Sequence, residues 1–258
     1  MRALPLSSRV ALVTGVSRRA GIGFAIAKRL ASLGADLCVH AYAPYDAAQP
    51  WGADREPPEA LAGDLRALGV RAEPLAADLA EPGAPERLIA EAWQRLGRVD
   101  VLVANHAHSV SADLEGLRAE EVDRHFAVNV RATLLLVQAF AARHDGRAGG
   151  RVVLLTSGQD RGPMPGELAY AASKGALASL VPSLSAHLAH RGITVNAVDP
   201  GATDTGWASP ELHREVLARE PQGRWGAPDD AARLVGWLAT DDARWLTGQV
   251  IHSTGGGP

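Results

Sequence analysis

A tyrosine and a lysine spaced four residues apart are the residues best suited to chemistry in this chain. Tyr170 and Lys174 stand out because the sequence holds three tyrosines and, apart from Lys28, no other lysine beside its many arginines. On a helix this spacing places both side chains on one face. A compact ammonium there would lower the pKa of the phenol, a task that suits a planar guanidinium less well. The pair predicts a proton donor, although an exposed lysine on an amphipathic helix explains the spacing equally well.

A glycine-rich turn connects the first apolar run, residues 10–14, to a helical pattern over residues 23–33. Glycines let the backbone approach a phosphate, and a helix N-terminus offers free N–H groups and a favourable dipole. Because the turn lies between a strand and a helix, it indicates a dinucleotide site rather than an ordinary turn. The residues expected to hold the dinucleotide here are Gly15, Ser17, Arg18, Arg19, Gly21, Ile22 and Gly23.

The end of the second predicted strand helps to choose the cofactor. This end reads His40-Ala41-Tyr42 and carries no carboxylate, whereas an NAD site usually places Asp or Glu there to bind the ribose 2′-hydroxyl. The missing acid, with Arg18 and Arg19 in the preceding turn, favours the 2′-phosphate of NADP(H). NAD(H) is the alternative if both arginines are solvated loop charges.

Apolar runs that alternate with helical patterns would position these residues. Strands that are apolar throughout indicate a parallel sheet covered on both faces, which is the doubly wound α/β architecture with its ligand crevice at the carboxyl ends of the strands. A Pro-rich stretch, residues 44–58, interrupts this pattern as a local insertion. We expect strands at 10–14, 36–41, 72–76, 99–105, 151–156, 193–198 and 248–252, and helices near 23–33, 59–68, 85–96, 119–143 and 168–191.

Composition narrows the partners and the compartment. A chain of 258 residues with 47% hydrophobic residues suits one α/β domain, and a net charge of −3 gives no basic footprint for nucleic acid. Cys38 is the only cysteine, which excludes an intrachain disulfide, and no His/Cys/Asp cluster has the spacing of a metal site. Residues 1–9 lack the apolar stretch of a signal peptide, and no apolar run is long enough to span a membrane. We expect a cytoplasmic protein without membrane or nucleic-acid partners.

The strand ending at Thr156 runs into Ser157, thirteen residues before Tyr170. With this serine the chain resembles the classical short-chain dehydrogenase/reductase family over essentially its full length. The resemblance implies a single Rossmann-type domain over residues 1–258 with about seven strands, an NAD(P)-dependent oxidoreductase acting on CH–OH or C=O groups, and a homotetramer or homodimer. The matching motifs are Thr14/Gly15/Gly21/Gly23, Asp78, Asn129, Ser157, Tyr170/Lys174 and the Pro-Gly loop that begins at Pro200.

The family's catalytic roles carry over onto four residues. By resemblance, Tyr170 gives a proton to a carbonyl oxygen, Ser157 hydrogen-bonds the same oxygen, and Lys174 also binds the nicotinamide ribose. Asn129 would hold a water that links Lys174 to solvent, unless it merely caps or bends its helix. The further dinucleotide contacts expected along the chain are Ala41, Asp78, Leu79, Asn105, Lys174, Pro200, Gly201, Thr203 and Thr205.

Two departures from the family concern the turn and the fourth strand. Five residues rather than three separate Gly15 from Gly21, so the turn must bulge and the role of Arg18 is less certain. The family's Asn-Asn-Ala-Gly reads Ala104-Asn105-His106-Ala107 here. His106 and His108 are candidates for substrate contact, although loop histidines bonded to the backbone are the commoner case.

The substrate pocket is expected between residues 158–166 and a loop region over residues 203–222. Its candidate contacts are His106, Gly158, Met164 and Trp207. Within the family the chain is most similar to proteins labelled 3-oxoacyl-[acyl-carrier-protein] reductase. We therefore expect an NADPH-dependent ketoreductase acting on a small-molecule carbonyl that is free or thioester-linked. The alternatives are an alcohol dehydrogenase, an imine reductase of secondary metabolism, or a non-catalytic dinucleotide sensor.

Overall fold

Seven parallel strands form one sheet in the computed structural model, which describes residues 3–257. The strand order is β3-β2-β1-β4-β5-β6-β7, and every neighbouring pair is parallel. The predicted fold class is therefore confirmed, including the number of strands. The strands are β1 (Val10–Thr14), β2 (Asp36–Ala41), β3 (Ala72–Ala76), β4 (Val101–Ala104), β5 (Gly150–Leu155), β6 (Ile193–Asp199) and β7 (Val250–His252).

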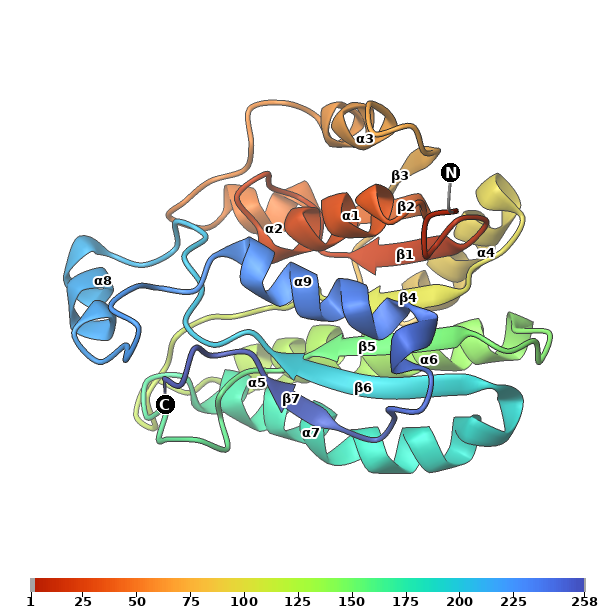
Figure 1. The fold of residues 1–258 in the computed structure, drawn as a ribbon. Coiled ribbons are helices and arrows are strands. Elements are labelled where there is room, and N and C mark those ends of the chain that lie inside the picture. Colours follow the sequence, from red (N-terminus) through yellow and green to blue (C-terminus); the bar gives the residue numbers. More distant parts are fainter. Residues whose placement is uncertain (1–2, 258) are drawn as a thin grey trace.

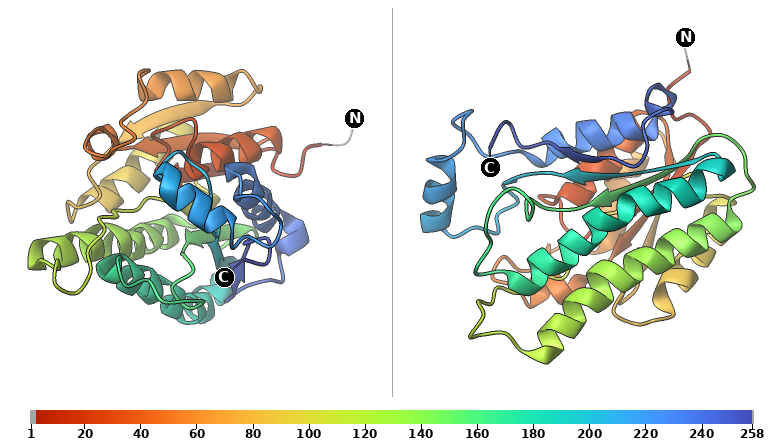
Figure 2. Two further views of the ribbon diagram at one scale, coloured as in Figure 1. Left: turned by 90° about the vertical axis from the view of Figure 1, so that its left-hand side faces the viewer. Right: turned by 90° about the horizontal axis from the view of Figure 1, so that it is seen from below.

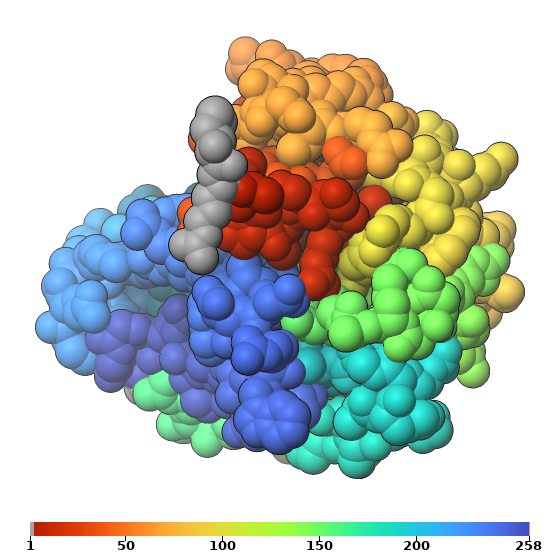
Figure 3. Space-filling model, turned by 45° about the vertical axis from the view of Figure 1, so that its right-hand side comes forward, coloured from red at the N-terminus to blue at the C-terminus, as the bar shows by residue number. Residues whose placement is uncertain are grey.

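Helices cover both faces of this sheet, as strands that are apolar on both sides require (Figures 1 and 2). One face is covered by α1 (Ile22–Ser32), α3 (Pro58–Arg66) and α9 (Pro228–Ala239). The other face is covered by α4 (Ala84–Leu96), α6 (Ala132–Arg143) and α7 (Leu168–Leu188). Because α1 packs against α9, the C-terminal part of the chain lies beside the N-terminal part (Figure 3).

Strands β1 and β4 lie side by side in the middle of the sheet. From β1 the chain adds strands toward one edge, and from β4 it adds them toward the other, so the direction reverses between these two strands. In open parallel sheets the crevice outside the carboxyl ends at such a reversal is the usual ligand site. The turn from β1 into α1 lies there and is tightly packed: a Cβ on Gly23 would lie 2.2 Å from the Gly15 carbonyl oxygen. Gly23 therefore serves the packing of the turn.

A π-helical turn interrupts the long helix expected over residues 119–143. The segment consists of α5 (Ala119–His125), η1 (Phe126–Arg131) and α6, with Asn129 inside the π-helical part. By length and composition alone the segment Ala119–Arg143 could cross a membrane, but half of its most apolar window is buried inside the fold. Buried core helices have the same composition.

Two short helices occur where we expected irregular chain. Helix α2 (Ala43–Ala47) begins the insertion after β2, and α8 (Pro210–Leu217) lies within the loop region 203–222. Proline at the start of each helix is compatible with its first turn, where no N–H partner is needed. The remaining short elements are the 3₁₀ turns η2 (Ala189–Arg191) and η3 (Asp241–Ala243).

Candidate active site

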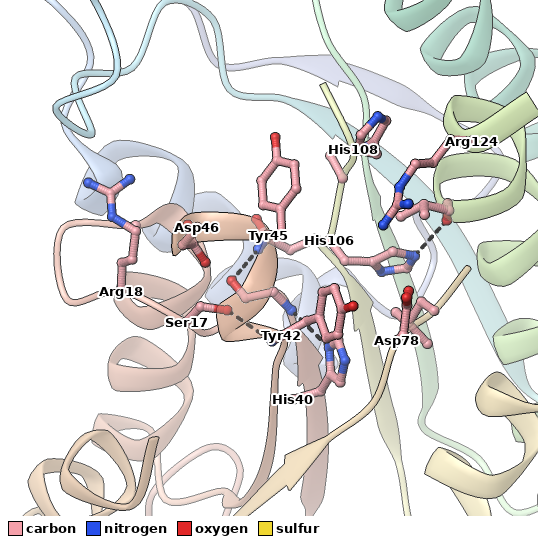
Figure 4. A pocket seen from close by; sticks show the side chains of 16 residues that line it. Ser17, Arg18, His40, Tyr42, Tyr45, Asp46, Asp78, His106, His108 and Arg124 are labelled. Atoms are coloured by element: carbon pink, nitrogen blue, oxygen red, sulfur yellow. Dashed lines mark hydrogen bonds between the residues drawn. The ribbon is translucent and has the colours of Figure 1, made fainter. Parts of the chain in front are cut away.

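Two cavities lie at the carboxyl ends of the strands. We call them the glycine-turn cavity, which Gly15 and Asp78 line, and the Tyr170 cavity, which Ser157 and Tyr170 line. The predicted residues divide between them. Those on the glycine-turn cavity are Gly15, Ser17, Arg18, Gly21, Asp78, Leu79, Asn105 and His106 (Figure 4). Those on the Tyr170 cavity are Ile22, Ser157, Gly158, Met164, Tyr170, Pro200, Gly201, Thr203, Thr205 and Trp207.

The glycine turn fits a pyrophosphate group. Helix α1 has Gly21 as its N-cap and no side chain capping its first N–H groups, which leaves these donors free for an anion. Asn105 Nδ2 donates to the carbonyl oxygens of Thr14 and Gly15, each at 3.0 Å. A Cβ on Gly15 would lie 2.8 Å from the same amide nitrogen, and Gly15 has a φ of +72°. Only glycine therefore fits at this position of the cradle.

Two neutral histidines brace this turn. His40 Nε2 donates to Ala77 O (3.0 Å) while its Nδ1 accepts from the Gly15 N–H (3.3 Å), and burial lowers the pKa of His40 to about 4. His106 Nε2 donates to Val128 O (3.0 Å), and its Nδ1 accepts from the Thr14 hydroxyl (2.7 Å). Burial, followed by His40 and Lys174, lowers the pKa of His106 to about 3.

The prediction that His106 contacts substrate is therefore corrected. Its ring lies between β1 and η1 on the glycine-turn cavity, and both of its ring nitrogens already have protein partners. The reading as a loop histidine bonded to the protein holds for this residue.

The two arginines of the turn have different environments. Arg19 lines neither cavity, because its guanidinium pairs with Glu56 and with Asp64 (2.9 Å), and its backbone N–H donates to Asp54 (2.7 Å). This removes the expected cofactor contact of Arg19. Arg18 lines the glycine-turn cavity, lies 5.6 Å over the ring of Trp51, and donates to Thr205 O at 2.8 Å. Figure 4 shows it on the side of the cavity away from Asp78 and Arg124.

The insertion after β2 contributes residues that sequence reasoning missed. The Tyr45 hydroxyl donates to Ser109 O (3.3 Å) and accepts from Ser109 N–H (3.2 Å). Tyr45 lines the glycine-turn cavity and Ser109 the Tyr170 cavity, so this bridge lies where the two cavities meet. Asp46 accepts from Trp51 Nε1 at 3.2 Å, and burial raises the pKa of its carboxyl group. The only signal for these residues in the sequence was a run of residues compatible with a helix directly after the end of a strand.

Tyr170 and Lys174 lie on one face of α7, as predicted, with Lys174 Nζ 5.7 Å from the centre of the Tyr170 ring. Lys174 is buried behind the cavity and donates to Leu155 O at 2.7 Å. Burial lowers its pKa to about 8. Burial and then the nearby Glu167 raise the pKa of the Tyr170 phenol, while a hydrogen bond from Ser157 acts in the opposite direction. The net shift of the phenol pKa is therefore upward, because burial outweighs the groups that lower it.

Asn129 connects the loop after β4 to α7. Its Oδ1 accepts from His108 N–H (2.7 Å), and its Nδ2 donates to His108 O and Ser173 Oγ, each at 2.9 Å. The side chain is fully buried. These partners fix the amide, so its side chain holds the residue before Lys174 in place. Among the described residues the amide oxygen keeps one free acceptor position, and the expected water relay stays a prediction.

Three residues that could ligate a metal come together although their sequence spacing indicates no site. Candidate ligand atoms of His108, Glu121 and His125 lie within 4.8 Å of one another. His125 Nδ1 donates to Glu121 O (2.7 Å) and its Nε2 accepts from Val110 N–H (3.2 Å), while His108 Nε2 bonds Glu121 Oε2 (2.9 Å). Since His108 and Glu121 already bond each other and both ring nitrogens of His125 bond backbone groups, we assign the group a bracing role beneath the loop after β4.

Ala41 lies outside both cavities as well. It is buried in β2, paired with Ala76 of β3, and its neighbour Tyr42 lines the glycine-turn cavity instead. Further lining residues that the sequence did not single out are Arg124, Thr156 and Glu167.

Comparison with known proteins identifies the family. A family model described as enoyl-(acyl carrier protein) reductase matches residues 15–257. An uncharacterized oxidoreductase of Bacillus subtilis, YjdA, is 42% identical over 250 residues, which cover 96% of each chain. With the seven-stranded fold, these matches show that the chain belongs to the short-chain dehydrogenase/reductase family of oxidoreductases. The label 3-oxoacyl-[acyl-carrier-protein] reductase describes it only approximately.

Two solved structures add detail. A short-chain dehydrogenase from Burkholderia cenocepacia in complex with NADP has a TM-score of 0.86 and 36% identity, covering 98% of both chains. The promiscuous reductase LugOII, which catalyses keto-reduction at C1 during lugdunomycin biosynthesis, has a TM-score of 0.85 and 36% identity, again with 98% of both chains covered.

Proposed function

We propose that this protein reduces a ketone to a secondary alcohol, with NADPH as the hydride donor. The observation that carries the proposal is the placement of Ser157 and Tyr170 on one cavity, with Lys174 behind the phenol. This cavity adjoins the glycine-turn cavity, whose uncapped helix N-terminus and close-packed glycines fit a pyrophosphate. The keto-reduction attributed to LugOII supports the reaction class.

The dinucleotide would extend over both cavities. The glycine turn and Asp78 would hold its adenosine and phosphates, and Thr203 and Thr205 would lie at its nicotinamide end. When bound, NADPH supplies the hydride that forms the new C–H bond at the carbonyl carbon.

Tyr170 performs the matching proton step. As the carbonyl carbon gains its hydrogen, the electron pair of the C=O double bond moves onto oxygen, and the phenol O–H gives that oxygen its proton. Burial raises the pKa of the phenol, which keeps it protonated before reaction but weakens it as an acid, so the phenolate has to be stabilised as it forms. Ser157 donates a second hydrogen bond to the same oxygen and fixes its position. Lys174 stabilises the phenolate that remains.

The preference for NADPH rests on cations of the glycine-turn cavity. Arg18 and Arg124 line it, the end of β2 carries no carboxylate, and among solved relatives are NADP and NADPH complexes. Asp46 opposes this preference, since a carboxylate near the ribose repels a phosphate. We infer that Arg18, which lies on the same side of the cavity as Asp46 (Figure 4), outweighs it.

The experiment is to follow oxidation of NADPH and of NADH against a panel of free and thioester-linked ketones. We expect turnover with at least one ketone and a lower KM for NADPH. A clear preference for NADH would overturn the cofactor assignment. A panel without any reduction, with the dinucleotide bound, would overturn the reaction.

A further inference from the structure

One carboxylate stands out in the Tyr170 cavity. The walls are largely apolar, with Pro163, Met164 and Trp207 among them, and the charged residues on them within the described chain are Glu167 and Arg219. Arg219 pairs with Glu215 at 2.6 Å and is largely exposed, so it belongs to the rim. Glu167 is the charge that a substrate meets inside.

The carboxylate of Glu167 has no hydrogen-bond partner or ion pair among residues 3–257. Its backbone is fixed, because its N–H donates to Met164 O (3.1 Å) and the next residue donates to Ala112 O (3.4 Å). Glu167 is the N-cap residue of α7, yet its side chain does not cap the helix. An acid at this position usually complements the helix dipole. That role forms no hydrogen bond, so the carboxylate oxygens of Glu167 stay unbonded. Burial raises the pKa of this carboxyl group, and His125 acts in the opposite direction.

Glu167 also stands close to the reacting groups. It precedes Tyr170 by three residues at the start of the same helix, whereas Lys174 follows Tyr170 by four. The phenol therefore lies between a cation on its buried side and an anion on its cavity side. The anion holds the proton on the phenol, since it raises the pKa of Tyr170.

We propose that Glu167 binds a hydrogen-bond donor on the substrate, and that the natural substrate is a ketone carrying a hydroxyl group or a protonated amine within reach of this carboxylate. The inference rests on the proposed function and deepens it. A plain ketone in this cavity would take water from the carboxylate and give it no partner, which is costly. A donor on the substrate restores that hydrogen bond, and hydrogen bonds to charged groups are among the stronger ones. A substrate carboxylate would be repelled.

The same contact orients the substrate. With its carbonyl oxygen held by Ser157 and Tyr170, a donor bound at Glu167 fixes a second point, so that a ring is held against rotation in the cavity. These two points fix an axis, and the apolar walls at Met164 and Trp207 restrict rotation about it, so that one face of the carbonyl meets the hydride donor.

The test compares tetralone with its ring-hydroxylated derivatives, and cyclohexanone with piperidone, using NADPH and three proteins. These are the wild type, Glu167→Gln, and Glu115→Gln as the control. Glu115 is an exposed carboxylate in the neighbouring loop that lines neither cavity. Each donor-bearing ketone keeps the ring system of its plain partner and adds the donor.

We expect the wild type to prefer at least one donor-bearing ketone by about tenfold or more in kcat/KM, mainly through KM. Glu167→Gln should lose most of that preference, because a neutral amide oxygen accepts a weaker hydrogen bond than a carboxylate, and should change kcat/KM for the plain ketone less than about threefold. The control should keep the wild-type preference. If a hydroxylated tetralone is preferred over tetralone, the donor on the substrate is neutral. If only piperidone is preferred over its plain partner, the donor is cationic.

Two outcomes would overturn the proposal, and they are distinguishable. If the wild type reduces plain and donor-bearing ketones equally well, or if Glu167→Gln keeps the preference, the inference about Glu167 fails while the proposed reaction stands. If no ketone is reduced although NADPH binds, the proposed function fails and this inference fails with it.

Discussion

The glycine-turn cavity and the Tyr170 cavity lie at the same edge of one sheet, yet their polar side chains are used differently. In the glycine-turn cavity Asn105, His40 and His106 are bonded to the backbone or to Thr14. In the Tyr170 cavity the Thr156 hydroxyl is buried without a partner within the described chain, and Glu167 has none either. The first cavity is preorganised for one ligand, whereas the second depends on its ligand to complete its bonds.

This contrast has a physical reason. A dinucleotide offers the same phosphates and ribose to every member of the family, so a rigid cradle with fixed donors suits it. Substrates differ among members, and their differences are met by side chains from loops, here residues 158–167 and 203–222. The comparison predicts that substitutions in the two cavities should separate cofactor binding from turnover.

The largest expected effect comes from the proton donor. Tyr170→Phe should lower kcat by about 10³-fold, since general acid catalysis is worth two to four orders of magnitude. NADPH binding should persist, because the substitution removes only the hydroxyl that meets the substrate carbonyl oxygen and leaves the glycine turn unchanged. Steady-state turnover and a fluorescence titration with NADPH measure the two effects. Turnover within about tenfold of the wild type would show that the proton comes from another group, and unchanged thermal unfolding would show that the fold is intact.

A smaller effect, on the stability of the fold, is expected from Asn129, which joins the loop after β4 to α7. Asn129→Ala removes three hydrogen bonds and leaves both backbone groups of His108 without partners. We expect the free energy of unfolding to fall by about 3 kcal/mol, because unsatisfied buried polar groups cost about 1–3 kcal/mol each. Urea unfolding measures it, with Asn129→Asp as the comparison, since a carboxylate keeps the acceptor for His108 N–H. A loss below about 1 kcal/mol would mean that the loop after β4 does not depend on this amide.

The glycine-turn cavity itself can be tested with the two adjacent arginines of the glycine turn, of which Arg18 alone lines the cavity. Arg18→Ala should raise the KM for NADPH about tenfold and leave the KM for NADH nearly unchanged, since a charge-assisted bond to the 2′-phosphate is lost. Arg19→Ala is the matched control, because Arg19 pairs with Glu56 and Asp64 outside the cavity. Equal effects of the two substitutions, or equal effects on both dinucleotides, would show that Arg18 does not select NADPH.

These outcomes also show what the sequence could and could not predict. The strands and most helices followed from apolar runs and periodic patterns, because a parallel sheet buried on both faces leaves that record. The four-residue spacing of Tyr170 and Lys174 likewise predicted that both side chains lie on one face of a helix. The π-helical turn at Asn129 leaves no periodic signal, so the segment was predicted as one helix.

Side-chain partners were harder to predict than elements. Arg18 and Arg19 are adjacent and identical in type, and only the folded insertion supplies the acids that turn Arg19 away. His106 was expected near substrate because of its place after a strand, but the Thr14 hydroxyl and the Val128 carbonyl hold its ring. Both errors depend on contacts between segments distant in the sequence.

The smallest expected effect concerns the boundary between the cavities. A dinucleotide that spans both must pass the bridge from Tyr45 to Ser109. Tyr45→Phe removes both hydrogen bonds of this bridge and should speed NADPH release about threefold to tenfold, given about 0.5–1.5 kcal/mol for each ordinary hydrogen bond.

Stopped-flow displacement of bound NADPH measures this rate, and the chain offers a sharp control. Because Tyr45 bonds the backbone of Ser109, Ser109→Ala keeps the bridge and should leave the release rate unchanged. If both substitutions speed release alike, the two hydrogen bonds are not sufficient and the Ser109 side chain also helps to retain the dinucleotide. If neither does, the glycine turn retains the dinucleotide without help from the insertion, and the boundary between the two cavities has no part in holding it.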